Sequence, residues 1–100
     1  MKFQLGKLVA TRTVADLMAT DALFSQFVSD SLKRYMDGDW GDLDKSDLAQ
    51  NEAALQSGED RLFAAYKLHS AFAGCKTEDK IWIITEWDRS VTTVLFPSEY

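Results

Sequence analysis

The chain has 100 residues, of which 46% are apolar and 27% charged, and its formal net charge is −5. This size and composition are typical of a single folded domain, so we expect residues 1–100 to share one hydrophobic core. The acidic balance and the scattered Lys and Arg residues argue against nucleic-acid binding, which needs clustered positive charge.

The chain carries few features of secreted, membrane or metal-binding proteins. Cys75 is the only cysteine, so the chain can form no internal disulfide and no zinc site built from several thiolates. No apolar run approaches the roughly 20 residues that span a bilayer, and the N-terminus has no signal-peptide pattern. We expect a cytoplasmic protein that binds neither a membrane nor a cofactor.

The first third of the chain predicts a short strand followed by two helices. Residues 7–11 favour β-structure, and Thr13 is a suitable N-cap for a brief helix. Thr20 or Asp21 could cap the second helix, whose apolar residues recur every three or four positions as far as Tyr35.

The rest of the chain predicts a third helix and then a sheet. Asp44 can cap a helix that ends near Gly58, and alternating or β-branched residues follow it. Three strands are expected, at residues 61–69, 80–87 and 91–96. The strand at residues 7–11 could join them at an edge. The predicted fold is α+β, with two or three N-terminal helices packed on one face of a three- to four-stranded antiparallel sheet.

Four phrases stand out along the chain: residues 5–11 (LGKLVAT), 38–43 (GDWGDL), 81–93 (IWIITEWDRSVTT) and 97–100 (PSEY). They resemble a family of small proteins from bacterial plasmids, phages and integrated elements, often labelled "plasmid-related protein" or "type I restriction endonuclease subunit M". The chain has one proline and lacks the Asn-Pro-Pro-aromatic loop of a methyltransferase subunit. The resemblance therefore implies a mobile-element origin and carries no established activity.

Residues 37–47 hold most of the charge imbalance. Five aspartates and one lysine give this stretch a charge of −4, which leaves −1 for the other 89 residues. Such a focused negative field attracts cations or a basic protein surface. We do not expect a metal site, because a calcium loop starting at Asp37 or Asp39 lacks the required glycine and the bidentate glutamate.

The candidate residues for binding a partner come from this acidic stretch and from the hairpin tip predicted at residues 85–90. Trp40 is flanked by two glycines and is expected to fold back on the core, with an exposed binding anchor as the alternative. Glu86 and Asp88 resemble a general acid/base pair only superficially, and a cross-strand or turn salt bridge with Arg89 is the favoured interpretation. The candidates are Asp37, Asp39, Trp40, Asp42, Glu86, Trp87, Asp88 and Arg89.

His69 and Cys75 are the other chemically reactive side chains. His69 has no recognisable nucleophile beside it, so we expect a surface or turn histidine. Cys75 precedes Lys76 and is expected to be an ordinary thiol.

These features favour a non-enzymatic protein-binding or inhibitor module whose partner presents a basic surface, with carboxylates taking positions otherwise filled by phosphates. Two alternatives stay open. One is a self-associating accessory domain. The other is a small enzyme or ligand-binding domain with a polar cleft between the sheet and the helices, which would use Arg61, Glu86, Asp88 or Arg89.

Overall fold

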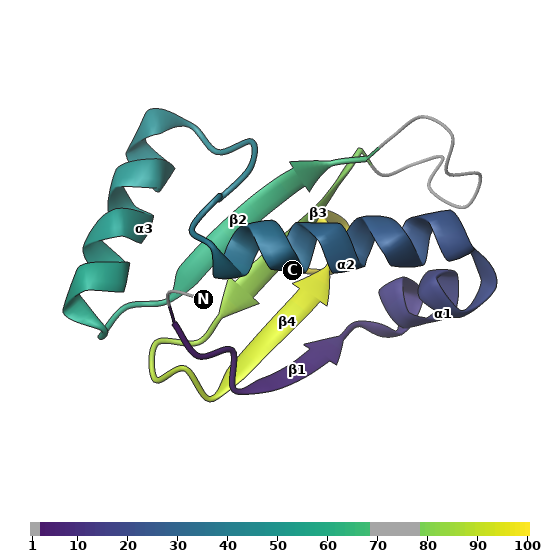
Figure 1. Ribbon diagram of the computed structural model, residues 1–100, viewed down its shortest axis with the longest axis horizontal. Helices are drawn as coiled ribbons and strands as arrows, with labels where there is room; N and C mark the ends of the chain where they lie inside the picture. The colour runs from purple at the N-terminus through teal and green to yellow at the C-terminus, as the bar shows by residue number, and fades with distance from the viewer. Residues whose placement is uncertain (1–2, 69–78) are drawn as a thin grey trace.

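The computed structural model describes residues 3–68 and 79–100. Within these residues the fold is α+β, with three α-helices, one short 3-10 helix and a four-stranded mixed sheet (Figure 1). The elements are β1 (Lys7–Ala10), α1 (Arg12–Thr20), α2 (Ala22–Met36), α3 (Lys45–Ser57), β2 (Leu62–Lys67), β3 (Lys80–Thr85), β4 (Val91–Leu95) and η1 (Pro97–Glu99). The predicted connection at residues 70–79 lies outside the described residues except for Asp79, and so do His69 and Cys75.

The sheet has the strand order β1-β4-β3-β2, and β2, β3 and β4 form the predicted antiparallel meander. The prediction of a wholly antiparallel sheet is wrong at β1, which pairs in parallel with β4. The Lys7 amide donates to the Ser90 carbonyl (2.9 Å) and the Thr11 amide donates to the Val94 carbonyl (3.0 Å). Both strands therefore enter the sheet from the same end.

The helix starts follow from local capping. The Asp21 carboxylate accepts hydrogen bonds from the amides of Leu23 (3.0 Å) and Phe24 (3.1 Å), which fixes the start of α2. Asp44 caps α3 in the same way by accepting from the Asp47 amide (2.8 Å). The first helix begins one residue before Thr13, so the prediction of Thr13 as its N-cap is wrong.

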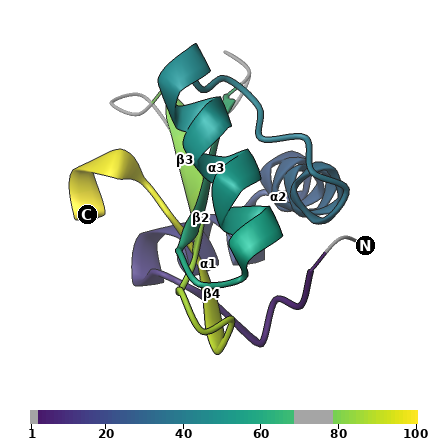
Figure 2. The ribbon, with the colours of Figure 1, turned by 90° about the vertical axis from the view of Figure 1, so that its left-hand side faces the viewer.

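Helix α2 covers one face of the sheet, whereas α3 stands beside the outer edge of β2 (Figures 1 and 2). The prediction of two or three N-terminal helices on one face holds for α1 and α2 and does not extend to α3, which contacts β2. The core lies between α1, α2 and the covered face. Its most buried apolar residues are Val14, Phe24, Val28, Tyr35, Leu62, Ala64, Tyr66, Ile81, Ile83, Val94 and Phe96.

A chain of buried hydroxyls crosses this core. The Tyr35 hydroxyl contacts Thr85 Oγ1 (2.7 Å), and Thr85 Oγ1 contacts Thr92 Oγ1 (2.7 Å). Thr92 in turn donates to the carbonyl of Leu5 (2.7 Å). Because a carbonyl can only accept, each hydroxyl donates to the next one along this chain, and all three buried hydroxyls are satisfied. Burial raises the pKa of Tyr35, which keeps this hydroxyl protonated.

Candidate functional site

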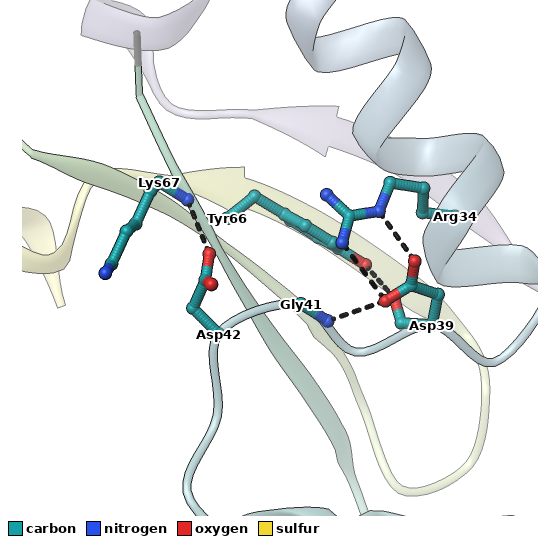
Figure 3. Close-up of polar contacts among 6 residues, drawn as sticks. All are labelled: Arg34, Asp39, Gly41, Asp42, Tyr66 and Lys67. Carbon is teal, nitrogen blue, oxygen red and sulfur yellow. Dashed lines mark hydrogen bonds and ion pairs between the residues drawn. The ribbon is translucent and has the colours of Figure 1, made fainter.

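The acidic stretch contains a strap, residues 39–42, that runs along the outer edge of β2 (Figure 3). The Asp42 amide donates to the Ala65 carbonyl (2.7 Å), and the Ala65 amide donates to the Trp40 carbonyl (3.3 Å). The Asp42 carboxylate then accepts from the Lys67 amide (3.0 Å). An unpaired edge strand can pair with strands of other chains and lead to aggregation. The strap therefore protects the edge of β2 against such pairing.

Asn51 on α3 continues this cover along β2. Its side-chain nitrogen donates to the Phe63 carbonyl, and its side-chain oxygen accepts from the Phe63 amide (3.1 Å). The Asn51 side chain thus takes the place of a neighbouring strand, and it is buried in doing so.

The charge of Asp39 is matched within the chain. Arg34 Nε donates to one carboxylate oxygen of Asp39 (2.7 Å), while Arg34 Nη2 and the Gly41 amide donate to the other (3.2 and 3.1 Å; Figure 3). The hydrogen bond from Arg34 is the main reason that the pKa of Asp39 is lowered. The guanidinium also lies over the Tyr66 ring, 4.9 Å from its centre. Asp39 is therefore a structural residue of the strap.

Trp40 and Gly41 are also structural. Trp40 is only 3% exposed, packs edge-on against Tyr35 and donates from its indole nitrogen to Glu52 (3.0 Å). Trp40 therefore folds back on the core, as the sequence predicts, and the alternative of an exposed binding anchor is wrong. Gly41 has a φ of 74°, and a Cβ there would overlap the Ala65 carbonyl, so the strap requires glycine at this position.

The predicted hairpin tip is exposed, but its polar groups mostly serve the turn. Arg89 donates to the carbonyls of Ala54 and Asp60 and to two carbonyls within the turn, rather than bridging to a carboxylate as expected. Asp88 accepts from the hydroxyl and the amide of Ser90, and the hydroxyl is the main reason that its pKa is lowered. Trp87 is 61% exposed, and Glu86 beside it is also exposed.

A hollow of about 860 Å³ lies on the other face of the sheet, away from α2. In Figure 2 this face is the one turned toward η1, and α3 stands along its border. The floor comes from alternate residues of β2 and β3, and the walls come from α3, from the segments before α3 and β2, and from the end of the chain. The lining residues are Asp42, Leu43, Asp44, Asp47, Gln50, Asn51, Ala53, Asp60, Arg61, Phe63, Ala65, Lys80, Trp82, Ile84 and Tyr100.

Aromatic rings form the apolar part of the hollow. Trp82 stands between Phe63 and Tyr100, with ring centres 5.1 and 5.7 Å apart and edge-to-face geometry on both sides. Arg61 donates to the Tyr100 hydroxyl and lies over its ring. Phe63 and Trp82 are partly buried, whereas Tyr100 is 68% exposed. The rings are rigid and remain open to contact from outside.

Small residues adjoin one another where the strap meets β2. Gly41 pairs with Ala65 across the strap, and Ala65 pairs with Trp82 across β2 and β3. Neighbouring strands lie about 4.8 Å apart, so the backbone of Trp82 lies about two strand spacings from the strap.

Carboxylates outnumber cations around the hollow. Asp42, Asp44, Asp47 and Asp60 face Arg61 and Lys80 in its lining, which leaves a formal charge of −2. The ion pairs within residues 3–68 and 79–100 are Arg12–Asp16 and Arg34–Asp39, so neither cation of the lining is paired with a rim carboxylate. The hollow combines an aromatic floor with a negative rim, and this combination favours a cationic ligand.

Of the residues predicted to bind a partner, the structure places only Asp42 in the lining. The aromatic floor was missed. In the sequence, Phe63 and Ala65 occupy alternate positions of one strand, and Trp82 and Ile84 occupy alternate positions of the next. These residues indicate a shared surface only once the strand register brings them to one face. In the part of the chain that the structure describes, no group of three His, Cys, Asp or Glu side chains is placed to hold a metal ion.

Comparison of the chain with models of protein families, with curated proteins and with solved structures found no match. The resemblance to plasmid-related proteins thus stays a prediction. No helix among the described residues has both the length and the apolar composition required to cross a bilayer.

Proposed function

We propose that this chain is a small non-enzymatic module that binds another protein, and that the partner docks in the hollow on the second face of the sheet. The partner would present a basic surface, as the charge pattern of the sequence suggests. An inhibitory role, in which carboxylates replace nucleic-acid phosphates, is a further part of this proposal that rests on the sequence alone.

The observation that supports docking is the open aromatic floor inside a negative rim. Trp and Tyr are enriched among the residues that dominate binding energy at protein interfaces, because they bury a large area at a low cost in conformational entropy. Trp82 and Tyr100 both line the hollow, and four aspartates line it as well. An opposite charge on a partner would be steered toward this face and then held by the rings.

The docking surface differs from the one expected from the sequence. Asp39 serves the strap alone, whereas Asp42, which also bonds the strap to β2, lines the hollow together with Asp44 and Asp47. Asp42 and Asp44 each accept a backbone amide, but a carboxylate that accepts one hydrogen bond keeps its charge and further acceptor sites. These residues can therefore be structural and attractive at once.

The alternative of an enzyme with a polar cleft is supported less. Of its four candidate residues only Arg61 lines the hollow. The pKa of Asp39 and the pKa of Asp88 are both lowered, which is the opposite of what a general acid requires, and neither residue lines the hollow.

The proposal can be tested by cross-linking from inside the hollow. A photoreactive phenylalanine analogue placed at Gln50, which is exposed in the lining, should give a discrete adduct with one partner in a lysate of the source organism. The same group at Ser29, which is exposed on α2, should not give that adduct. High salt should weaken the capture, because exposed charges are screened.

An added positive charge supplies a second test with a matched control. Ala53→Arg adds a bulky cation to the hollow at an exposed helical position, so it should abolish the adduct without unfolding the protein. Ala15→Arg makes the same change at an exposed position of α1 and should leave the adduct intact. An adduct that survives Ala53→Arg, or one that forms equally from Ser29, would show that the hollow is not the docking surface.

A further inference from the structure

The two edges of the sheet differ in how their backbone groups are satisfied. At the β2 edge, the strap and Asn51 bond to outward-facing amides and carbonyls. The strand order ends at β1 on the opposite side, where β1 forms the border of the sheet (Figure 1). Within residues 3–68 and 79–100, the isolated bridge outside the named strands joins Gly41 to Ala65 at the β2 edge. In this part of the chain β1 is therefore the open edge.

Alternate backbone groups of β1 point out of the sheet. The amides of Lys7 and Thr11 bond to β4, and alternate residues of a strand bond to the same neighbour. The amides and carbonyls of Leu8 and Ala10 therefore face away from β4. Both side chains are exposed, and the large apolar side chain of Leu8 is 49% exposed. An edge of this kind can pair with a strand of another chain.

We propose that this edge pairs with β1 of a second copy of the chain, antiparallel about a two-fold axis beside Val9. In this register Leu8 of each copy forms a hydrogen-bonded pair with Ala10 of the other, and Val9 lies opposite Val9. Every outward-facing amide and carbonyl of Leu8 and Ala10 then has a partner. Two four-stranded sheets join into one continuous sheet.

The side chains of β1 complement a second copy of the same strand. The opposed Val9 side chains form a β-branched pair, which stabilises neighbouring strands. Lys7 lies opposite Thr11 of the other copy, and the Thr11 hydroxyl donates to Glu99 (2.8 Å). The same Glu99 oxygen accepts from the Phe96 amide (2.9 Å), so this exposed carboxylate is held in place. Each copy thus brings its ammonium group near a carboxylate of the other.

The position of Lys7 also selects the register. A lysine on an edge strand usually opposes pairing, because its charge meets no opposite charge on the incoming strand. The proposed register avoids this cost, whereas a shift of two residues would place Lys7 opposite Val9. The hollow is lined from β2 and β3 rather than from β1 or β4, so this inference does not rest on the proposed function.

Cysteine cross-linking tests the register. In a Cys75→Ser background, which removes the native thiol, Val9→Cys places two thiols across the two-fold axis. The Cα atoms of such a non-hydrogen-bonded pair lie about 4.5 Å apart, within the span of a disulfide. Oxidised glutathione should therefore convert Val9→Cys to a covalent dimer. The matched control Leu8→Cys faces Ala10 of the other copy and should give about fivefold less dimer, because its two thiols are too far apart.

Sedimentation equilibrium measures the association without a cross-link. The wild-type chain should dimerise with a dissociation constant of about 100 µM, because a short strand pairing buries little surface. Ala10→Pro removes an outward-facing amide and leaves the bonds to β4, so it should weaken dimerisation at least about tenfold. The matched control Ala22→Pro, at the first residue of α2, is compatible with a helix start and should change nothing.

A charge change keeps the inference testable if Ala10→Pro does not fold. Lys7→Glu, at an exposed position, sets a carboxylate against Glu99 of the other copy and should weaken dimerisation about fivefold. Adding Glu99→Gln, which keeps an acceptor for the Thr11 hydroxyl, should recover most of this loss. A chain that stays monomeric at 1 mM, about ten times the expected dissociation constant, would overturn the inference. Equal cross-linking from Val9→Cys and Leu8→Cys, or association that the folded Ala10→Pro variant retains, would overturn it as well.

Discussion

The two faces of the sheet are built from alternate residues of the same strands and have different properties. On the face under α2, Ile81, Ile83 and Thr85 of β3 are all fully buried, and the buried hydroxyls are paired. On the other face, Trp82 is partly buried and borders an open hollow. A change of one residue along β3 therefore moves a side chain from the closed core to the lining of the hollow.

The two faces therefore contribute differently to the stability of the fold and to binding. The covered face supplies most of the buried apolar area, and burial of that area is the main favourable term in folding. On the open face, the rings of Phe63, Trp82 and Tyr100 are in partial contact with solvent rather than packed in the core. A surface that is costly to leave open in this way is a candidate for recognition.

The strongest test of the comparison is a pair of identical substitutions at adjacent residues of β3. Ile83→Ala should lower the free energy of unfolding by about 3–4 kcal/mol, because Ile83 lies inside the closed core. Ile84→Ala should cost less, about 2 kcal/mol, because Ile84 is 7% exposed and lines the hollow, so that water can enter the space left behind. Urea unfolding followed by circular dichroism measures both values.

If Ile83→Ala does not fold, the milder pair Ile83→Val and Ile84→Val should keep the same order, at about 1 and about 0.5 kcal/mol. Equal losses at the two positions would mean that the second face is as closed as the first.

Two neighbouring threonines of β4 make a smaller and chemically distinct test. Thr92→Val removes the donor to the Leu5 carbonyl and breaks the buried hydroxyl chain, so it should cost about 2 kcal/mol. Thr93→Val lies on the open face, where Val suits a strand as well as Thr does, and should change stability by less than about 0.5 kcal/mol. A loss at Thr92 no larger than that at Thr93 would show that the hydroxyl chain is not needed.

Much of the fold could be predicted from the sequence because its signals are local. Apolar spacing predicted α2, and carboxylates at Asp21 and Asp44 predicted where two helices begin. The direction of β1 was missed, because it depends on pairing with a strand more than 80 residues away that leaves no local pattern. The position of α3 at the sheet edge was missed for a related reason, since Asn51 acts on a backbone rather than on an apolar face.

Of the candidate site, only the negative charge could be predicted from the sequence. The acidic stretch was evident, but the use of each aspartate was not, because Asp39 and Asp42 are told apart by which backbone and side-chain groups they meet. The strap adjoins β2 at Gly41 and Ala65, and Ala65 also lines the hollow. Such adjacency requires the three-dimensional register.

The smallest expected effect concerns the strap that borders both faces. Because the pKa of Asp39 is lowered in the folded protein, its contribution to stability is present above about pH 3.9, the value in the unfolded chain, and is lost as the pH falls through the lower folded value. Both side chains of the Arg34–Asp39 pair are about half exposed, so the effect should be near 0.5 kcal/mol. Urea unfolding at pH 6 and pH 2.5 should show that Asp39→Asn removes this part of the pH dependence, whereas Asp30→Asn does not. A wild-type pH dependence that Asp39→Asn leaves unchanged would mean that the strap is held by its backbone bonds to β2 alone.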